Sequence, residues 1–268
     1  MITAAEAAPA PLRFAILGNG AIAAEILRLV AERGGRAGPT PSLEYVGTVS
    51  RDASTLEAFA LDPATRADVV VEAASVAAVH EHGPRIIAAG VDLIVASVGA
   101  FATPSALPQL RASGTGRVHL TSGAIGGLDL LAAAGRTGGL DEVLVRSRKL
   151  PASLAQDWMS TSERSELFAL TAPRTLFSGT PAEAIEQFPS SLNVAVAVGL
   201  AVGDDSLVRV ELVADPAALL TEHTITASGP AGEYVFTIRN APLPARPASS
   251  GLTARALVAD LLRLAEQR

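Results

Sequence analysis

The chain has 268 residues, a net charge of −6, no cysteine and a hydrophobic share of 49%. This length suits one large domain or two modest ones, and the apolar content is enough for a core without disulfides. The absence of cysteine excludes thiolate metal sites and a cysteine nucleophile, and we expect no metal site. The mildly acidic balance argues against nucleic-acid binding as the main task.

Targeting signals are weak in this sequence. Residues 1–11 are rich in alanine but lack the basic start and the long apolar core of a signal peptide. The apolar stretches 69–74 and 193–202 are too short or too interrupted to span a bilayer. We therefore expect a cytoplasmic protein that does not enter the membrane.

Apolar runs and helix-like segments alternate over the first 120 residues. Gly90 is placed to end one of these helices. We expect strands and helices in the order 13–17 (strand), 21–33 (helix), 43–49 (strand), 68–72 (strand), 75–89 (helix), 92–97 (strand), 106–113 (helix) and 117–120 (strand), with a Gly/Pro-rich turn at 34–41. This alternation predicts an α/β fold whose N-terminal part, residues 1–120, is a Rossmann domain with a doubly wound parallel sheet.

The pattern changes after residue 120. We expect helices at 126–134, 181–187 and 192–202 and strands at 142–149, 207–214, 223–228 and 233–239. This order predicts a second, α+β domain over 121–251 with an open mixed sheet. A Pro-rich linker at 241–250 leads into a helix at 252–266, and residues 252–268 are expected to pack back on the first domain. Residues 157–173 carry no motif that we can place.

A glycine-rich turn joins the first strand to the first helix. Its sequence, Gly18-Asn19-Gly20-Ala21-Ile22-Ala23, fits G-x-G-x-x-A. The first glycine permits the tight turn, the second lets the backbone approach a pyrophosphate, and the alanine allows close helix packing. The free amides of the helix start suit phosphates. We predict that residues 18–22 bind NAD or NADP; the alternative is a plain turn that uses glycine for geometry.

The end of the second strand normally selects the cofactor. An acidic side chain there binds the adenine ribose of NAD, but this sequence has Ser50 followed by Arg51. Because an arginine suits a 2′-phosphate or stacks on adenine, NADP is allowed. The alternative is that Arg51 is solvated and Asp52 contacts the ribose.

Small and hydroxyl-bearing residues follow the next three strands, at the edge where ligands bind in such sheets. They leave room for a nicotinamide ribose and offer hydroxyl contacts. Ordinary helix capping by serine is the alternative for any one of them. The residues are Ala74, Ser75, Ser97, Val98 and Ala124 for the cofactor and Ser122 and Gly123 for the substrate.

Together these motifs resemble the L-aspartate dehydrogenase family. The resemblance runs over nearly the whole chain from residue 13. The segments that carry it are 18–23, 70–75, 96–100, 122–129, 148–149, 188–189, 193–195, 215–216 and His223.

The resemblance implies that L-aspartate is oxidised to iminoaspartate, with hydride transfer from the substrate Cα to C4 of NAD or NADP. The product hydrolyses to oxaloacetate and ammonia or feeds NAD biosynthesis. A homodimer that forms through the second sheet is also implied. By position, Ala124 and Asn193 match nicotinamide-side contacts, and His223 matches the catalytic histidine.

The chemistry of the residues agrees with these roles. Hydride transfer needs a positioned substrate and a group that handles a proton, and histidine titrates near neutral pH. Of the four histidines, His80 and His82 are expected on the surface of a helix and His119 inside a strand. His223 begins a strand in the second domain, and without the family match a structural role would be the commoner interpretation.

A dicarboxylate substrate also needs cationic or hydroxyl partners. Lys149 and Arg148 are candidates, although a solvated strand end is the alternative for both. Asn193 can contact both cofactor and substrate as a donor, or it caps a helix. Two other functions stay open: a dehydrogenase of the same build on another small acid or semialdehyde such as homoserine, and a non-catalytic NAD(P)-binding sensor.

Overall fold

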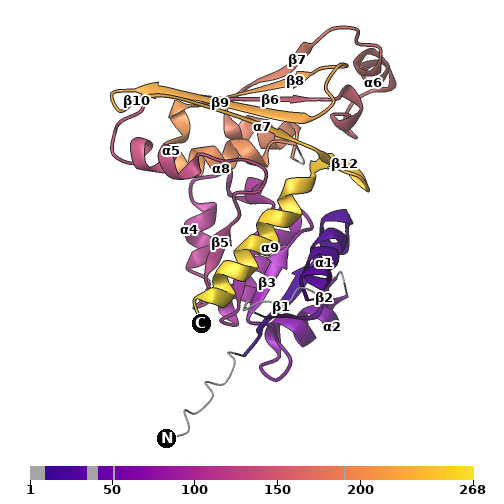
Figure 1. Ribbon diagram of the computed structural model, residues 1–268, viewed down its shortest axis with the longest axis vertical. Helices are drawn as coiled ribbons and strands as arrows, with labels where there is room; N and C mark the ends of the chain where they lie inside the picture. The colour runs from indigo at the N-terminus through magenta and orange to yellow at the C-terminus, as the bar shows by residue number, and fades with distance from the viewer. Residues whose placement is uncertain (1–9, 35–41, 51, 190) are drawn as a thin grey trace, which may run out of the picture.

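The computed structural model describes residues 10–34, 42–50, 52–189 and 191–268. It contains two main sheets, one above the other along the long axis of the molecule in Figure 1. The first sheet has the strand order β2-β1-β3-β4-β5 and the second β10-β9-β6-β8-β7.

The elements around the first sheet are β1 (Leu12–Leu17), α1 (Ala21–Gly34), β2 (Leu43–Val49), α2 (Ala53–Leu56), the π-helical turn η1 (Glu57–Leu61), β3 (Val69–Glu72), α3 (Val76–Ala88), β4 (Asp92–Val95), the 3-10 turn η2 (Val98–Phe101), α4 (Ala106–Arg111) and β5 (Val118–Leu120). Those that follow are α5 (Leu128–Gly135), β6 (Glu142–Lys149), η3 (Pro151–Ser153), α6 (Thr161–Phe168), β7 (Arg174–Gly179), α7 (Pro181–Gln187), α8 (Asn193–Val202), η4 (Asp205–Leu207), β8 (Val208–Ala214), β9 (Thr221–Gly229), β10 (Gly232–Asn240), β11 (Pro242–Leu243), β12 (Arg246–Ser250) and α9 (Gly251–Glu266).

The first sheet is parallel throughout, as the alternation of strands and helices predicts. Its inner strand β3 is buried along its whole length, because helices cover both faces of such a sheet. The C-terminal helix α9 packs beside α1 on one face, where Leu257 and Leu261 join Phe14, Ile16 and Ile26 in one apolar cluster. Residues from opposite ends of the chain therefore complete the same layer (Figure 1).

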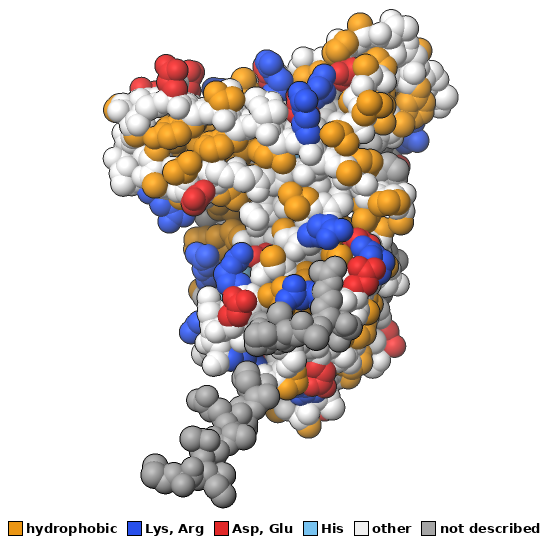
Figure 2. Space-filling view, viewed as in Figure 1, with side chains coloured by type: hydrophobic (Ala, Val, Ile, Leu, Met, Phe, Trp, Pro, Cys, Tyr) orange, Lys and Arg blue, Asp and Glu red, His pale blue; other side chains and the backbone are white. Residues whose placement is uncertain are grey.

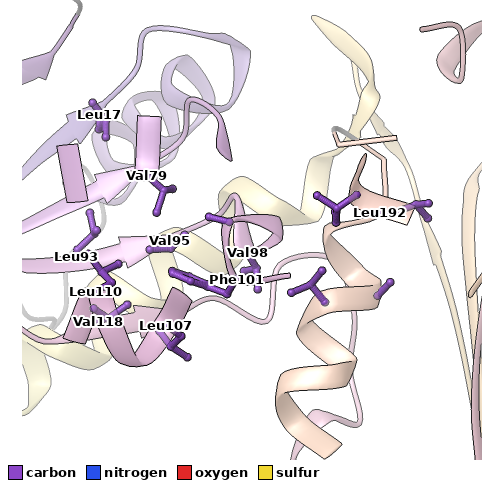
Figure 3. Close-up of a cluster of buried hydrophobic side chains, with 14 of the residues drawn as sticks. Leu17, Val79, Leu93, Val95, Val98, Phe101, Leu107, Leu110, Val118 and Leu192 are labelled. Atoms are coloured by element: carbon purple, nitrogen blue, oxygen red, sulfur yellow. The ribbon is translucent and has the colours of Figure 1, made fainter. Parts of the chain in front are cut away.

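The core on the other face continues into the second half of the chain. In Figure 3, Leu93, Val95 and Leu110 lie beside the turn η2, and η2 in turn lies beside Leu192 at the start of α8. The same cluster includes Leu212 of the second sheet. Because this apolar contact is continuous, it fixes the position of the second sheet over the carboxyl end of the first.

The second sheet is mixed. Strands β6 and β8 are parallel, and the remaining neighbours are antiparallel. Helices α5 and α8 cover one face, where Leu131 and Val198 pack with Val143, Val145 and Ile225. Side chains on the strands alternate between buried and partly exposed, which is the pattern of a sheet with one covered face. The predicted open mixed sheet is confirmed.

One sequence interpretation was wrong, and the set of expected elements was incomplete. The expected linker at 241–250 is a two-stranded sheet of β11 and β12 followed directly by α9. The stretch 157–173, which carried no recognised motif, contains α6. Strand β7 was not anticipated. A capping box between Ser160 and Glu163 starts α6, so an S-x-x-E signal was present in the sequence. Of the expected turn at 34–41, residues 35–41 lie outside the described residues, and Gly34 ends α1.

Candidate active site

A cavity of about 640 Å³ lies where the carboxyl end of the first sheet meets the second domain. Its walls come from the β1–α1 turn, the segments after β3, β4 and β5, strands β6 and β9, helix α8, and the β12–α9 junction. The predicted site residues that line it are Gly20, Ala21, Ile22, Ala74, Ser75, Ser97, Val98, Ser122, Gly123, Ala124, Lys149, Asn193 and His223. Residues far apart in the sequence thus share one site of a size typical for small-molecule ligands.

The glycine turn has the geometry that a pyrophosphate needs. Gly18 has a φ of 110°, and a Cβ on it would lie 2.9 Å from the Ala74 Cβ, so this position requires glycine. A Cβ on Gly20 would meet nothing within 4 Å, because it would project into open space beside the cavity. Ala23 is buried against the sheet as predicted. Gly18 and the exposed Asn19 shape the turn without lining the cavity.

The loop after β2 is held by its own side chains. The Ser50 amide donates to Thr55 Oγ1 at 2.8 Å, and Ser50 Oγ accepts from the Asp52 amide at 3.2 Å. The Asp52 carboxylate accepts from the Ser54 amide at 3.0 Å, and its hydrogen bonds with Ser54 lower the Asp52 pKa. Both side chains are thus engaged locally, and neither lines the cavity. Arg51 lies outside the described residues.

Glu72, to which the sequence analysis gave no role, connects two walls of the cavity. It is fully buried, and its carboxylate accepts from the amides of Ala74 (2.7 Å), Ala96 (3.1 Å) and Ser97 (2.8 Å) and from the Ser97 hydroxyl (2.9 Å). Burial raises the pKa of this carboxyl, and the four donors oppose that shift. A glutamate that ends an otherwise apolar strand was the available sequence signal.

Two further residues at the strand ends, Ser75 and Ala124, form hydrogen bonds within the protein. Ser75 Oγ accepts from the Ala78 amide at 3.2 Å, so Ser75 caps α3 as well as lining the cavity. The Ala124 carbonyl accepts from Asn240 Nδ2 at 2.7 Å, which ties the loop after β5 to the end of β10. Helix capping, the alternative interpretation, therefore holds for Ser75.

Asn193 joins the two halves of the site. Its Oδ1 accepts from the Gly99 amide at 2.8 Å, although Asn193 is the first residue of α8 and Gly99 lies in η2 after β4. The N-cap of α8 is Leu192, and no side chain caps this helix, so the helix-cap interpretation was wrong. Since the Oδ1 atom is committed to Gly99, the Nδ2 amide is the group that Asn193 offers to the cavity.

His223 lies on the cavity side of the second sheet. It is only 4% exposed, and its Nδ1 lies 2.8 Å from Ser147 Oγ, the residue directly opposite on β6. Burial, reinforced by the charge of Lys149, lowers the His223 pKa to about 3. The free protein therefore holds a neutral imidazole at this position at physiological pH.

Lys149 is the only lysine of the chain, and its side chain is buried beside His223. Its Nζ donates to the Ser191 carbonyl at 3.2 Å. Within the described residues no carboxylate pairs with this ammonium group, and burial lowers its pKa to about 8. A buried cation without an anion is costly, so this position favours an anionic ligand.

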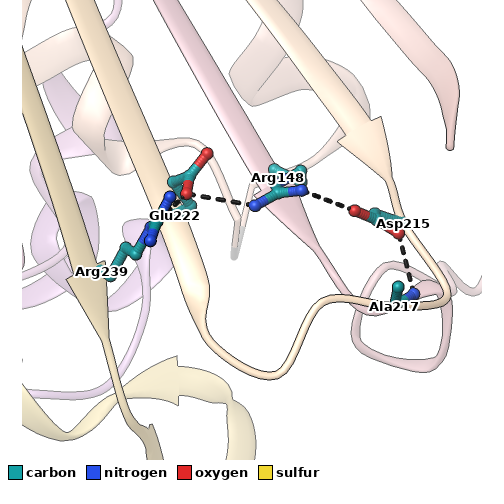
Figure 4. Close-up of polar contacts among 5 residues, drawn as sticks. All are labelled: Arg148, Asp215, Ala217, Glu222 and Arg239. Atoms are coloured by element: carbon teal, nitrogen blue, oxygen red, sulfur yellow. Dashed lines mark hydrogen bonds and ion pairs between the residues drawn. The ribbon is translucent and has the colours of Figure 1, made fainter.

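Arg148 is turned away from the cavity. As neighbours on a strand, Arg148 and Lys149 point to opposite faces of the sheet. The Arg148 guanidinium donates to Asp215 Oδ2 (2.8 Å) and Glu222 Oε2 (3.1 Å), and Arg239 donates to the same Glu222 oxygen at 2.6 Å (Figure 4). Arg148 therefore does not contact the cavity. Its side chain is 39% exposed near the end of β6, in line with the alternative of a solvated strand end, but it is also held by ion pairs.

The remaining histidines divide between the cavity and the scaffold. His80 is exposed on α3 and lines the cavity, which the sequence did not indicate. His119 Nε2 lies 3.0 Å from Asp92 Oδ2, across the β4–β5 pair, consistent with the structural role expected for it. The segment 246–253, which the sequence suggested was mostly linker, contributes Arg246, Ser250 and Thr253 to the cavity wall.

The fold and the cavity define a Rossmann-type, NAD(P)-binding oxidoreductase. Family models match both parts of the chain: "Homoserine dehydrogenase, NAD binding domain" over residues 18–119 and "Aspartate dehydrogenase, C-terminal" over residues 129–264. The L-aspartate dehydrogenase of Ruegeria pomeroyi is 37% identical over 93% of this chain and 91% of its own length. That of a Polaromonas species is 35% identical over 94% and 97%. The chain belongs to the L-aspartate dehydrogenase family.

Solved structures agree with this assignment. The aspartate dehydrogenase of Thermotoga maritima has a TM-score of 0.67 and 27% identity, with 96% of both chains covered. A hyperthermophilic archaeal homoserine dehydrogenase in complex with NADPH shares the fold at a TM-score of 0.58 and 11% identity, covering 97% of this chain and 99% of its own. Among the described residues, no helix is long and apolar enough to cross a membrane.

Proposed function

We propose that this protein oxidises L-aspartate to iminoaspartate, with NAD or NADP as the acceptor. The observation that carries the proposal is the juxtaposition of two groups on the wall of a cavity that begins at a dinucleotide-type glycine turn. One is a neutral buried imidazole, and the other is a buried ammonium that no described carboxylate neutralises. The first group suits a proton acceptor and the second suits a carboxylate.

The residues that would hold the cofactor fit it by shape. Backbone amides at the start of α1 offer donors to the pyrophosphate, and Gly20 leaves the approach open. Ala74, Ser97, Val98 and Ala124 form a wall of small side chains for the nicotinamide ribose. When bound, the oxidised nicotinamide supplies the acceptor for the hydride that leaves the substrate Cα.

His223 would accept the proton of the substrate ammonium group. For Nε2 to be the accepting atom, Nδ1 must carry the hydrogen and donate it to Ser147 Oγ, which fixes the tautomer. A substrate carboxylate beside Lys149 offsets the ammonium charge that contributes to the low pKa of His223, and the imidazole then becomes a more effective base.

The assembly of the protein belongs to the same proposal. We place the domain boundary near Leu120, with residues 252–268 in the first domain, and we infer a cytoplasmic homodimer. A dimer that forms through the outer face of the second sheet is supported by apolar side chains on that face: Val235 on β10 is 68% exposed, and Leu144 on β6 is partly exposed.

On the side seen in Figure 2, acidic and basic side chains lie intermixed over both parts of the molecule.

A steady-state assay with purified protein tests the function. We expect reduction of NAD or NADP with L-aspartate, and little with L-homoserine, since homoserine has a hydroxyl where aspartate has a carboxylate. Release of ammonia should match the cofactor reduced, because iminoaspartate hydrolyses. Tight NADPH or NADH binding without turnover of any amino or hydroxy acid would favour the sensor interpretation instead.

A further inference from the structure

Two buried polar groups on the cavity wall lack partners that such groups normally have. Lys149 is 5% exposed, its Nζ donates to the Ser191 carbonyl, and no described carboxylate neutralises it. Ser191 is also 5% exposed, and its hydroxyl has no hydrogen-bond partner among the described residues. Both residues line the same cavity. A buried ammonium group without a carboxylate and a buried hydroxyl without a hydrogen-bond partner are each rare in folded proteins, so their occurrence together calls for a ligand.

We propose that Lys149 and Ser191 form a subsite for the side-chain carboxylate of the substrate, an inference that rests on the proposed function. The Lys149 ammonium group supplies positive charge, and the Ser191 hydroxyl supplies a second hydrogen-bond donor to the same carboxylate. Ser191 carries no assignment from the sequence. It lies two residues before the start of α8, so the subsite joins β6 to the beginning of that helix.

The sheet register supports the side-chain carboxylate over the α-carboxylate. His223 is paired with Ser147, and Lys149 lies two residues further along β6 on the same face. Diagonal neighbours of this kind have Cα atoms about 7–8 Å apart. The α-carboxylate is attached to Cα, the same carbon that carries the amine near His223. The side-chain carboxylate of aspartate lies one carbon further from the amine and can reach further along the strand.

This arrangement predicts opposite effects of Ser191→Ala on the free and the bound protein. Removing a hydroxyl that has no hydrogen-bond partner among the described residues should leave thermal stability unchanged or raise it. The same change should weaken recognition of the substrate about tenfold, the usual scale for a hydrogen bond to a charged group. A serine that served only the fold would show a loss of stability instead.

The test compares L-aspartate with L-2-aminobutyrate, which replaces the side-chain carboxylate with a methyl group. Ser191→Ala should lower the aspartate-to-aminobutyrate ratio of kcat/KM about tenfold, and Lys149→Met about a hundredfold. With aminobutyrate, which has no carboxylate for the subsite, each variant should lose much less activity than with aspartate. Ser165→Ala, an exposed serine on α6, is the matched control and should change neither rate. Equal losses with both substrates would overturn the assignment.

Succinate separates failure of the subsite from failure of the function. In protein saturated with NADH or NADPH, calorimetry should show that Lys149→Met and Ser191→Ala bind succinate at least tenfold more weakly than wild type. If wild type binds succinate in this way but does not oxidise aspartate, the proposed function fails and the subsite stands. If wild type oxidises aspartate and both variants bind succinate as wild type does, the subsite is wrong.

Discussion

Ser147 and His223 face each other across the β6–β9 pair, with 2.8 Å between the serine Oγ and the imidazole Nδ1. Ser147 is completely buried and His223 nearly so, and no exposed loop contributes to this contact. The position of the imidazole is thus set by the register of two interior strands of the second sheet.

Replacing Ser147 with alanine tests this positioning. We expect kcat to fall roughly tenfold or more, because the imidazole loses the partner that orients it and selects its tautomer. The dissociation constant of NADH should change little. Ser147→Thr keeps a hydroxyl and should restore most of the rate. A threonine variant as slow as the alanine variant would show that packing alone, and not the hydrogen bond, explains the loss.

The low pKa of His223 predicts a loss of stability in acid. The unfolded chain takes up a proton below about pH 6.5, whereas the folded protein resists protonation until near pH 3. The contribution of His223 to the free energy of unfolding is therefore fully present above about pH 6.5 and is lost as the pH falls towards 3.

The measurement for His223 is urea unfolding at two pH values. Between about pH 7 and pH 5, wild type should lose about 2 kcal/mol more than His223→Gln. His80→Gln, which changes an exposed histidine, is the control and should behave as wild type. The variant His223→Gln should also reduce turnover about a hundredfold or more, while NADH still binds.

The Gly99 contact of Asn193 and the cofactor contact that we propose for it can be separated by an isosteric change. Asn193→Asp keeps an oxygen for the Gly99 amide but removes the Nδ2 donor that faces the cavity. We expect near-normal thermal stability with a rise in KM for the cofactor of about tenfold. Asn193→Ala should in addition lower stability, because the Gly99 amide loses its acceptor. Identical behaviour of both variants would mean that Asn193 acts only as a link between the domains.

Glu72→Gln should loosen the walls of the cavity. Glutamine keeps one oxygen and replaces the other with a nitrogen that cannot accept a hydrogen bond. The variant therefore loses either the two bonds to Oε1, from the Ala74 amide and the Ser97 hydroxyl, or the two bonds to Oε2, from the Ala96 and Ser97 amides. We expect a loss of about 1–3 kcal/mol in the free energy of unfolding and weaker NADH binding. Glu81→Gln is the matched control, since that side chain is 72% exposed. Unchanged NADH affinity in a destabilised Glu72→Gln protein would restrict Glu72 to a scaffold role.

The two glycines of the first turn should respond differently to alanine. Gly18→Ala should destabilise the protein, because its φ is positive and the new methyl would meet Ala74 at 2.9 Å. Gly20→Ala should fold normally, since nothing lies within 4 Å, yet bind NADH and NADPH more weakly by about tenfold or more. Thermal unfolding and fluorescence titration measure the two effects. Normal cofactor affinity in Gly20→Ala would argue against a pyrophosphate at this turn.

The sequence by itself determined the features that depend on local spacing. Apolar runs and helical periodicity placed nearly all the strands and helices of the first sheet, and the G-x-G-x-x-A turn indicated residues that line the cavity. The sequence also indicated Lys149, Asn193 and His223 as candidate site residues, and all three line the cavity. Short-range patterns suffice here because backbone conformation and burial period are local properties.

Only the tertiary structure decided what each side chain contacts. Arg148 and Lys149 are adjacent in sequence, but the pleat sends one into an ion-pair network and the other into the cavity. The Asn193–Gly99 bond and the Ser147–His223 pair join residues 94 and 76 positions apart. Ser191 gained its interest only when burial left its hydroxyl without a described partner. Such contacts follow from register and packing between distant segments, which no local pattern encodes.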